Sequence, residues 1–129
     1  MAQNFQNMAV WERSVELTVC IYQMTRLFPR EELYGLSSQM RRASVSIASN
    51  IAEGRGRLNI AEFRHFLSFA QSSLFELRTQ LEVARRLELA RPESLHKAQS
   101  LCKEVSKMLT SFIHTLGKSQ PPKRLKAES

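Results

Sequence analysis

The strongest constraint on the fold is a run of apolar side chains at alternating spacings of four and three residues. Its members are Phe63, Leu67, Ala70, Leu74, Leu77, Leu81 and Ala84. This spacing places them all on one face of an α-helix. A seam that keeps this period packs against another helix at a shallow angle, as in helical bundles. Asn59 is expected to cap the helix, with Glu62 in the capping-box position.

Three further stretches have the pattern of a helix: residues 10–28, 33–52 and 92–116. Pro29 is expected to stop the first, the glycines of segment 54–56 to end the second, and Gly117 to end the last. Short connections between helices of similar length favour antiparallel neighbours. The sequence therefore predicts an all-α fold, an antiparallel up-down-up-down four-helix bundle over residues 10–118. Residues 1–9 form an N-terminal arm and residues 119–129 a disordered basic tail in this prediction.

The composition narrows the class of protein further. The formal net charge is +7, which permits binding to nucleic acid. Every acidic residue is Glu, so any chemistry that needs Asp is excluded. Two cysteines do not make a disulfide scaffold. No run of eighteen apolar residues and no signal peptide is visible, so no membrane association is expected and the expected location is cytoplasmic.

Several runs carry a family resemblance: Phe28-Pro29, Glu32-Leu33-Tyr34-Gly35-Leu36, Ser38-Gln39-Met40-Arg41-Arg42-Ala43, Ser46-Ile47 and Asn50-Ile51-Ala52-Glu53-Gly54. With these runs the chain resembles the bacterial four-helix-bundle family, also called the ribosomal-RNA intervening-sequence protein family, over roughly residues 5–117. Accessory proteins of diversity-generating retroelements are distant relatives of that family. The resemblance implies a bundle that assembles into a homo-oligomeric ring, with a pentamer as the expected state. It also implies a link to RNA, and it implies no reaction.

Basic side chains cluster in two places that are candidates for binding nucleic acid. The first holds Arg41, Arg55, Arg57 and Arg64, and the second holds Lys123, Arg124 and Lys126 in the tail. Arginine forks match phosphate oxygens in pairs and stack on unpaired bases. Gly54 and Gly56 would let the backbone approach a phosphate closely. The alternative is that the first cluster is a solvated loop and the second a solubilising end.

A second set of residues is a candidate for an oligomer interface or a polar network: Tyr34, Arg42, Asn50, Glu53, Phe69, Val83 and Leu87. Asn50 and Glu53 are expected to accept hydrogen bonds from a neighbouring helix or subunit, and Arg42 to pair with a partner carboxylate. The alternative is that this polar stripe is an RNA-binding or catalytic site. The last three residues form an apolar stripe beside the seam, which either widens the core contact or serves assembly. Tyr34 is expected to pack under the turn between the first and second helices or into a partner subunit.

No catalytic, metal or cofactor site is expected. The three histidines are far apart, Cys102 lies on the apolar seam of the last helix, and Cys20 is expected to be partly exposed. Trp11 and Tyr22 are interpreted as core residues rather than base-stacking ones. The leading hypothesis is a non-enzymatic oligomeric bundle that binds structured RNA through Arg-rich surfaces. The alternative is a protein-interaction adaptor or scaffold with no nucleic-acid role.

Overall fold

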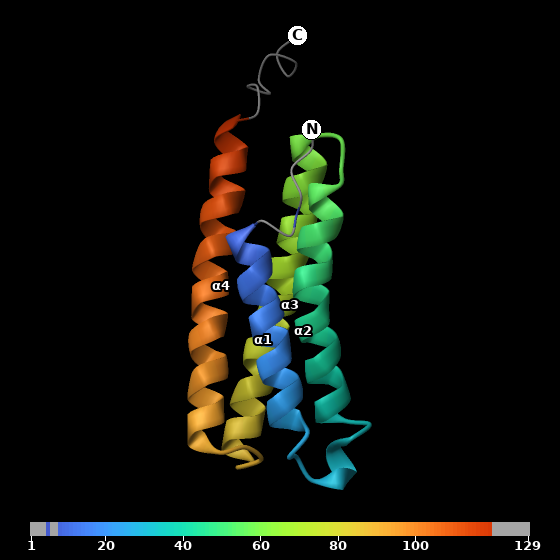
Figure 1. The fold of residues 1–129 in the computed structure, drawn as a ribbon, viewed down its shortest axis with the longest axis vertical. Helices are drawn as coiled ribbons and strands as arrows, with labels where there is room; N and C mark the ends of the chain where they lie inside the picture. Colours follow the sequence, from blue (N-terminus) through green and yellow to red (C-terminus); the bar gives the residue numbers. More distant parts are fainter. Residues whose placement is uncertain (1–4, 6–7, 120–129) are drawn as a thin grey trace.

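The computed structural model describes residues 5 and 8–119 of the chain, which contain four α-helices (Figure 1). These are α1 (Ala9–Thr25), α2 (Leu36–Arg55), α3 (Ile60–Arg86) and α4 (Pro92–Ser119), with a 3₁₀ turn, η2 (Arg30–Glu32), before α2. No strand occurs in this part of the chain, so the predicted all-α class is confirmed. Apart from Ser119, the predicted tail lies outside the described residues.

The four helices lie side by side along the long axis of the molecule (Figure 1). Helix α1 contacts α2 and α4, and α3 contacts the same two helices. The α1–α2 and α3–α4 turns lie at one end, and the α2–α3 turn lies at the other (Figure 1). The two ends of α2 therefore present their side chains at opposite ends of the bundle.

The core consists of one apolar seam from each helix. Every member of the predicted α3 seam is buried, and so are the α2 residues Met40, Ala43, Ile47 and Ile51. Helix α4 contributes Ala98, Cys102, Val105 and Leu109 at the same spacing. Burial of these apolar side chains is the main favourable term in folding. Within the described helices, none is both long and apolar enough to cross a membrane.

Helices α2 and α3 approach each other closely at Gly54. A Cβ atom built on Gly54 would lie 2.8 Å from the Cβ of Phe66 and 2.9 Å from Cδ1 of Phe63. The residue is buried in the last turn of α2, and Gly56 caps that helix. Because Gly54 faces α3, the expectation that it lets a phosphate approach the backbone is wrong.

The helix ends confirm one of the sequence signals and correct two others. The side chain of Asn59 accepts a hydrogen bond of 2.8 Å from the backbone N–H of Glu62, as its capping position predicts. Helix α1 ends at Thr25, earlier than expected, and Phe28 is buried beyond it. Gly117 does not end α4, which continues to Ser119. Its lack of a side chain leaves room for the Arg64 guanidinium, whose Nη2 would lie 3.0 Å from a Cβ there.

Substituting the two glycines at the end of α2 should have different effects. Gly54→Ala should lower the free energy of unfolding by about 1–3 kcal/mol, because the new methyl group overpacks the contact with α3. Gly56→Ala is the control, since its Cβ would meet nothing closer than 3.6 Å. It should be neutral or stabilising by up to about 1 kcal/mol. Urea denaturation of both variants measures the difference, and equal effects would contradict the account of the α2–α3 contact.

Candidate nucleic-acid interface

A hollow of ≈ 730 Å³ opens on the outward side of α2, near the α1–α2 turn. We call it the α2 hollow; it is lined by Tyr22, Leu33, Tyr34, Ser38, Arg41, Arg42, Val45 and Ser46. Tyr22 comes from α1, while Leu33 and Tyr34 come from the turn. Residues 38, 41, 42 and 45 share one helical face because they are three, four and seven residues apart.

Arg41 and Arg42 lie together in the hollow, and the hydrogen-bond partner of each is a neutral group. Nε of Arg41 donates to the hydroxyl of Thr25 at 2.9 Å, and Nη2 of Arg42 donates to the hydroxyl of Ser38 at 3.4 Å. No carboxylate lines the hollow among the described residues. Within the described chain Arg42 has no carboxylate partner, so both charges are available to an anion, and its pairing with a carboxylate of a neighbouring subunit stays a prediction.

Two tyrosines supply aromatic surface to the same hollow. Tyr34 is 93% exposed, and Tyr22 is 40% exposed with the Arg41 guanidinium carbon 5.0 Å from its ring centroid. The interpretation of Tyr22 as a core residue is wrong. Val19, three residues earlier, is also exposed, so both lie on a stripe turned away from the core.

The predicted cluster at the α2–α3 turn is arranged differently. Arg57 forms a 2.6 Å ion pair with Glu53, and its guanidinium carbon lies 4.5 Å from the Phe66 ring centroid. The guanidinium of Arg55 lies 5.7 Å from the ring centroid of Phe63. The charge of Arg57 is therefore already compensated, which weakens it as a ligand for phosphate.

Arg64 serves the contact between α3 and α4. Its Nε donates to the backbone carbonyl of Ile113 at 3.1 Å, and the guanidinium packs on Gly117. A cation near the last turn of a helix also interacts favourably with the helix dipole. Arg41 and Arg55 are about 21 Å apart along the axis of α2 at the rise of an α-helix. The structure thus separates the predicted arginines into two groups, while Lys123, Arg124 and Lys126 lie outside the described residues.

The polar network on α2 is internal to the chain. Nδ2 of Asn50 donates to the backbone carbonyl of Ser46 at 2.8 Å and approaches its hydroxyl at 3.0 Å. That hydroxyl shares a 2.9 Å hydrogen bond with the hydroxyl of Ser73 on α3. Within the described chain the bonds of Asn50 and Glu53 do not come from a neighbouring helix, and bonds from a neighbouring subunit stay a prediction. Asn50 acts as a donor within α2, and Glu53 pairs with the arginine four residues later, a spacing typical of helical ion pairs.

The apolar stripe on α3 does not widen the core. Phe69, Val83 and Leu87 are 44%, 41% and 58% exposed. The Phe69 ring contacts His65 and Phe66, with centroids 4.4 and 5.6 Å away. These contacts hold its ring on the surface, so the stripe is open to a partner.

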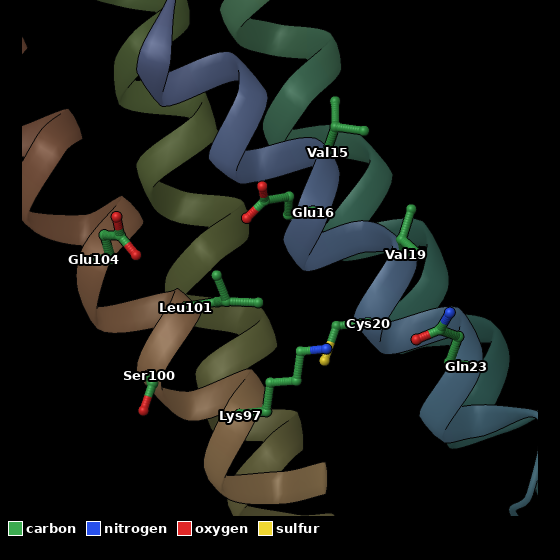
Figure 2. Close-up of a pocket in the computed structure, with 9 residues that line it drawn as sticks. All are labelled: Val15, Glu16, Val19, Cys20, Gln23, Lys97, Ser100, Leu101 and Glu104. Atoms are coloured by element: carbon green, nitrogen blue, oxygen red, sulfur yellow. The ribbon is translucent and has the colours of Figure 1, made fainter.

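A second hollow of ≈ 520 Å³ lies between α1 and α4 (Figure 2). Val15 and Val19 line it from α1, and Leu101 lines it from α4. The carboxylates of Glu16 and Glu104 lie on its rim, where Arg13 binds both, at 3.0 and 2.6 Å. Its acids are thus engaged and its walls are largely apolar, and Lys97 is the one basic residue in its lining, where the α2 hollow has two.

The two thiols are inert. Cys20 lines the α1–α4 hollow, yet it is only 6% exposed, so the expectation of partial exposure is wrong. Burial raises the pKa of the Cys20 thiol, although Lys97 across the hollow opposes the shift (Figure 2). Burial raises the pKa of Cys102 to about 12. No group of three His, Cys or Glu side chains that could hold a metal ion occurs in the described chain.

Comparisons with known proteins agree with the motifs in the sequence. A family model described as 23S rRNA-intervening sequence protein matches residues 6–111. The chain is also similar to a protein of unknown function from the S23 ribosomal protein family of Bacteroides thetaiotaomicron, known from a crystal structure. The two are 27% identical with a TM-score of 0.74, and the match covers 81% of this chain and 98% of the other. No curated protein matches the chain.

Both cysteines should resist thiol reagents in the folded protein. At pH 8 neither forms an appreciable fraction of thiolate, because burial holds both pKa values above the ordinary range. Cys102 should remain unreactive even at pH 10, since its pKa is about 12. Absorbance with an aromatic disulfide reagent should report two thiols only after denaturation. Modification of native Cys102 at the rate of a free thiol would contradict this account.

Proposed function

We propose that this chain, which belongs to the 23S rRNA-intervening sequence protein family, is a non-enzymatic bundle protein that binds structured RNA. The observation that carries the proposal is the α2 hollow. There, Arg41 and Arg42 keep uncompensated charge beside the exposed rings of Tyr22 and Tyr34. This combination matches the two chemistries of an RNA loop, a phosphate backbone and splayed bases.

The two kinds of side chain have complementary roles. Guanidinium groups bind phosphate oxygens through paired hydrogen bonds and stack on bases. Tyrosine rings stack on unpaired bases whatever their sequence, as in other single-strand binding surfaces. The net charge of +7 attracts a polyanion from a distance. The proposed ligand is therefore an RNA with unpaired nucleotides, held in the α2 hollow.

We further propose that the helices form an antiparallel up-down-up-down bundle and that the protein assembles into a homo-oligomeric ring, with five copies as the expected number. Support comes from the stripe of Phe69, Val83 and Leu87, which is open to a partner. A ring would repeat the α2 hollow in every subunit. Several weak contacts would then act together on one RNA, and avidity would exceed the affinity of a single hollow.

One set of observations favours a second function, a protein-interaction adaptor with no nucleic-acid role. Two of the arginines that were predicted to bind RNA are engaged within the chain: Arg57 forms an ion pair with Glu53, and Arg64 donates to a helix carbonyl. The exposed apolar stripe would then dock a protein partner. The adaptor hypothesis assigns the α2 hollow no ligand, so measurements of RNA affinity discriminate between the two.

Replacing the hollow's cations should weaken RNA binding. Arg41→Ser with Arg42→Ser should lower the affinity for a labelled stem-loop RNA by roughly tenfold or more. It should also reduce the salt slope by about two, because two phosphate contacts are lost. Fluorescence anisotropy from about 50 to 200 mM salt measures both quantities.

The matched control is Arg91→Ser with Lys107→Ser, which removes the same charge from two exposed residues outside the α2 hollow. It should change the affinity far less. Equal losses in the two double variants would show that only net charge matters. Binding that vanishes equally for RNA and for a duplex DNA of equal charge would favour the adaptor.

The assembly is tested by mass. Sedimentation velocity at micromolar concentration should give the mass of five 14.8 kDa chains. Phe69→Ser with Val83→Ser and Leu87→Ser should shift the mass toward the monomer and leave the helical content unchanged, since all three side chains are exposed. Leu58→Ser is the control, because Leu58 is exposed in a turn. A wild-type monomer would overturn the proposed ring.

A further inference from the structure

A third hollow, of ≈ 290 Å³, lies between α3 and α4. We call it the α3–α4 hollow; it is lined by Arg78, Leu81, Glu82, His96, Gln99, Ser100, Cys102 and Lys103. His96, Gln99 and Lys103 lie on one face of α4, since they are three and four residues apart. Arg78 approaches from α3. Two helices therefore direct cations and amide donors into one space.

Arg78 and Lys103, the two cations of this hollow, have no anionic partner within the described chain, and His96 beside them has none either. No hydrogen bond or ion pair of Arg78, His96 or Lys103 occurs within the described chain. Arg78 lies near enough to Cys102 to act on the charge of its thiol. An unpaired cation in a partly enclosed space interacts more strongly with an anion than one in open water does.

The single carboxylate in the lining is already neutralised from outside. Arg85 binds Glu82 through Nε at 3.0 Å and Nη2 at 2.7 Å, and Arg86 binds it through Nε at 2.8 Å. These hydrogen bonds lower the pKa of Glu82 to about 2. The charge of this carboxylate is therefore compensated by the two outer arginines and not by Arg78 or Lys103, so the hollow keeps its positive charge.

The floor of the hollow is neutral and its size is limited. Leu81 and Cys102 are buried there, and the Cys102 thiol is protonated because its pKa is about 12. The volume lies near the lower end of the ~300–1,000 Å³ range of small-molecule sites. A tetrahedral oxyanion with a small attached group fits these dimensions better than a flat polymer surface does.

We propose that the α3–α4 hollow binds a phosphate group, carried by a free nucleotide or by the end of an RNA strand. Arg78 binds two phosphate oxygens through its guanidinium fork, and Lys103 adds a point charge. The side-chain N–H groups of Gln99 and His96 donate to the remaining oxygens. This site is separate from the α2 hollow, and its existence does not depend on the proposed RNA interface or on the ring.

The test is a titration of the full-length protein into inorganic phosphate, followed by the ³¹P line width at constant ionic strength in chloride. Saturable broadening is expected, and Arg78→Gln with Lys103→Gln should weaken the binding at least tenfold. Arg91→Gln with Lys107→Gln removes the same charge outside the lining and should leave the affinity within about twofold. Circular dichroism checks that both double variants keep their helices.

Loss of binding in both double variants alike, or broadening that does not saturate, would overturn the site. The Arg41→Ser, Arg42→Ser double variant should still bind phosphate. The phosphate site can therefore be confirmed or overturned whether or not RNA binds the α2 hollow. Adenosine 5′-monophosphate and a short RNA, each compared with its 5′-hydroxyl form, identify the carrier. The ligand whose 5′-phosphate form binds more tightly is the source, and equal binding of the two forms in both pairs would overturn the proposal.

Discussion

Burial of one apolar seam on each helix is the constraint on which the surface depends. A helix that must turn its seam to the core has no freedom left in its rotation, so the positions of its other side chains are fixed. On α2, burial of Met40, Ile47 and Ile51 turns Arg42 and Val45 outward. The contact at Gly54 then holds α2 close to α3. The candidate sites are therefore consequences of core packing, although no core side chain lines the α2 hollow.

Charge alone does not distinguish the arginines of this chain, but their partners do. Arg57 faces a carboxylate four residues away, and Arg64 donates to a helix carbonyl. Arg41 and Arg42 instead donate to hydroxyl groups, which satisfy hydrogen bonds without neutralising charge. An arginine of this second kind keeps most of its attraction for an anion. The same distinction separates Arg78, which has no carboxylate partner in the described helices, from the arginines bound to Glu82.

Periodicity in the sequence predicts the fold well and the site only in part. The seam of α3, the cap at Asn59 and the start of α4 at Pro92 follow from local spacing and local hydrogen bonding, and the structure has all three. Gly117 does not end α4; it lies instead against Arg64, which is far away in sequence. Grouping of Tyr22 with Tyr34 depends on how α1 meets the following turn. Local patterns carry no information about such contacts. The sequence therefore indicates which arginines are candidates for binding RNA, but not which of them already have a partner within the chain.

Photochemical crosslinking tests most directly whether RNA occupies the α2 hollow. The full-length protein would be irradiated with a stem-loop RNA that carries 4-thiouridine in its unpaired positions. Mass spectrometry of the digested complex would then locate the modified residues. Adducts are expected at Tyr22 and Tyr34, the two exposed rings beside the uncompensated arginines. Adducts that are absent from both tyrosines and appear elsewhere on the chain would contradict RNA binding in the α2 hollow.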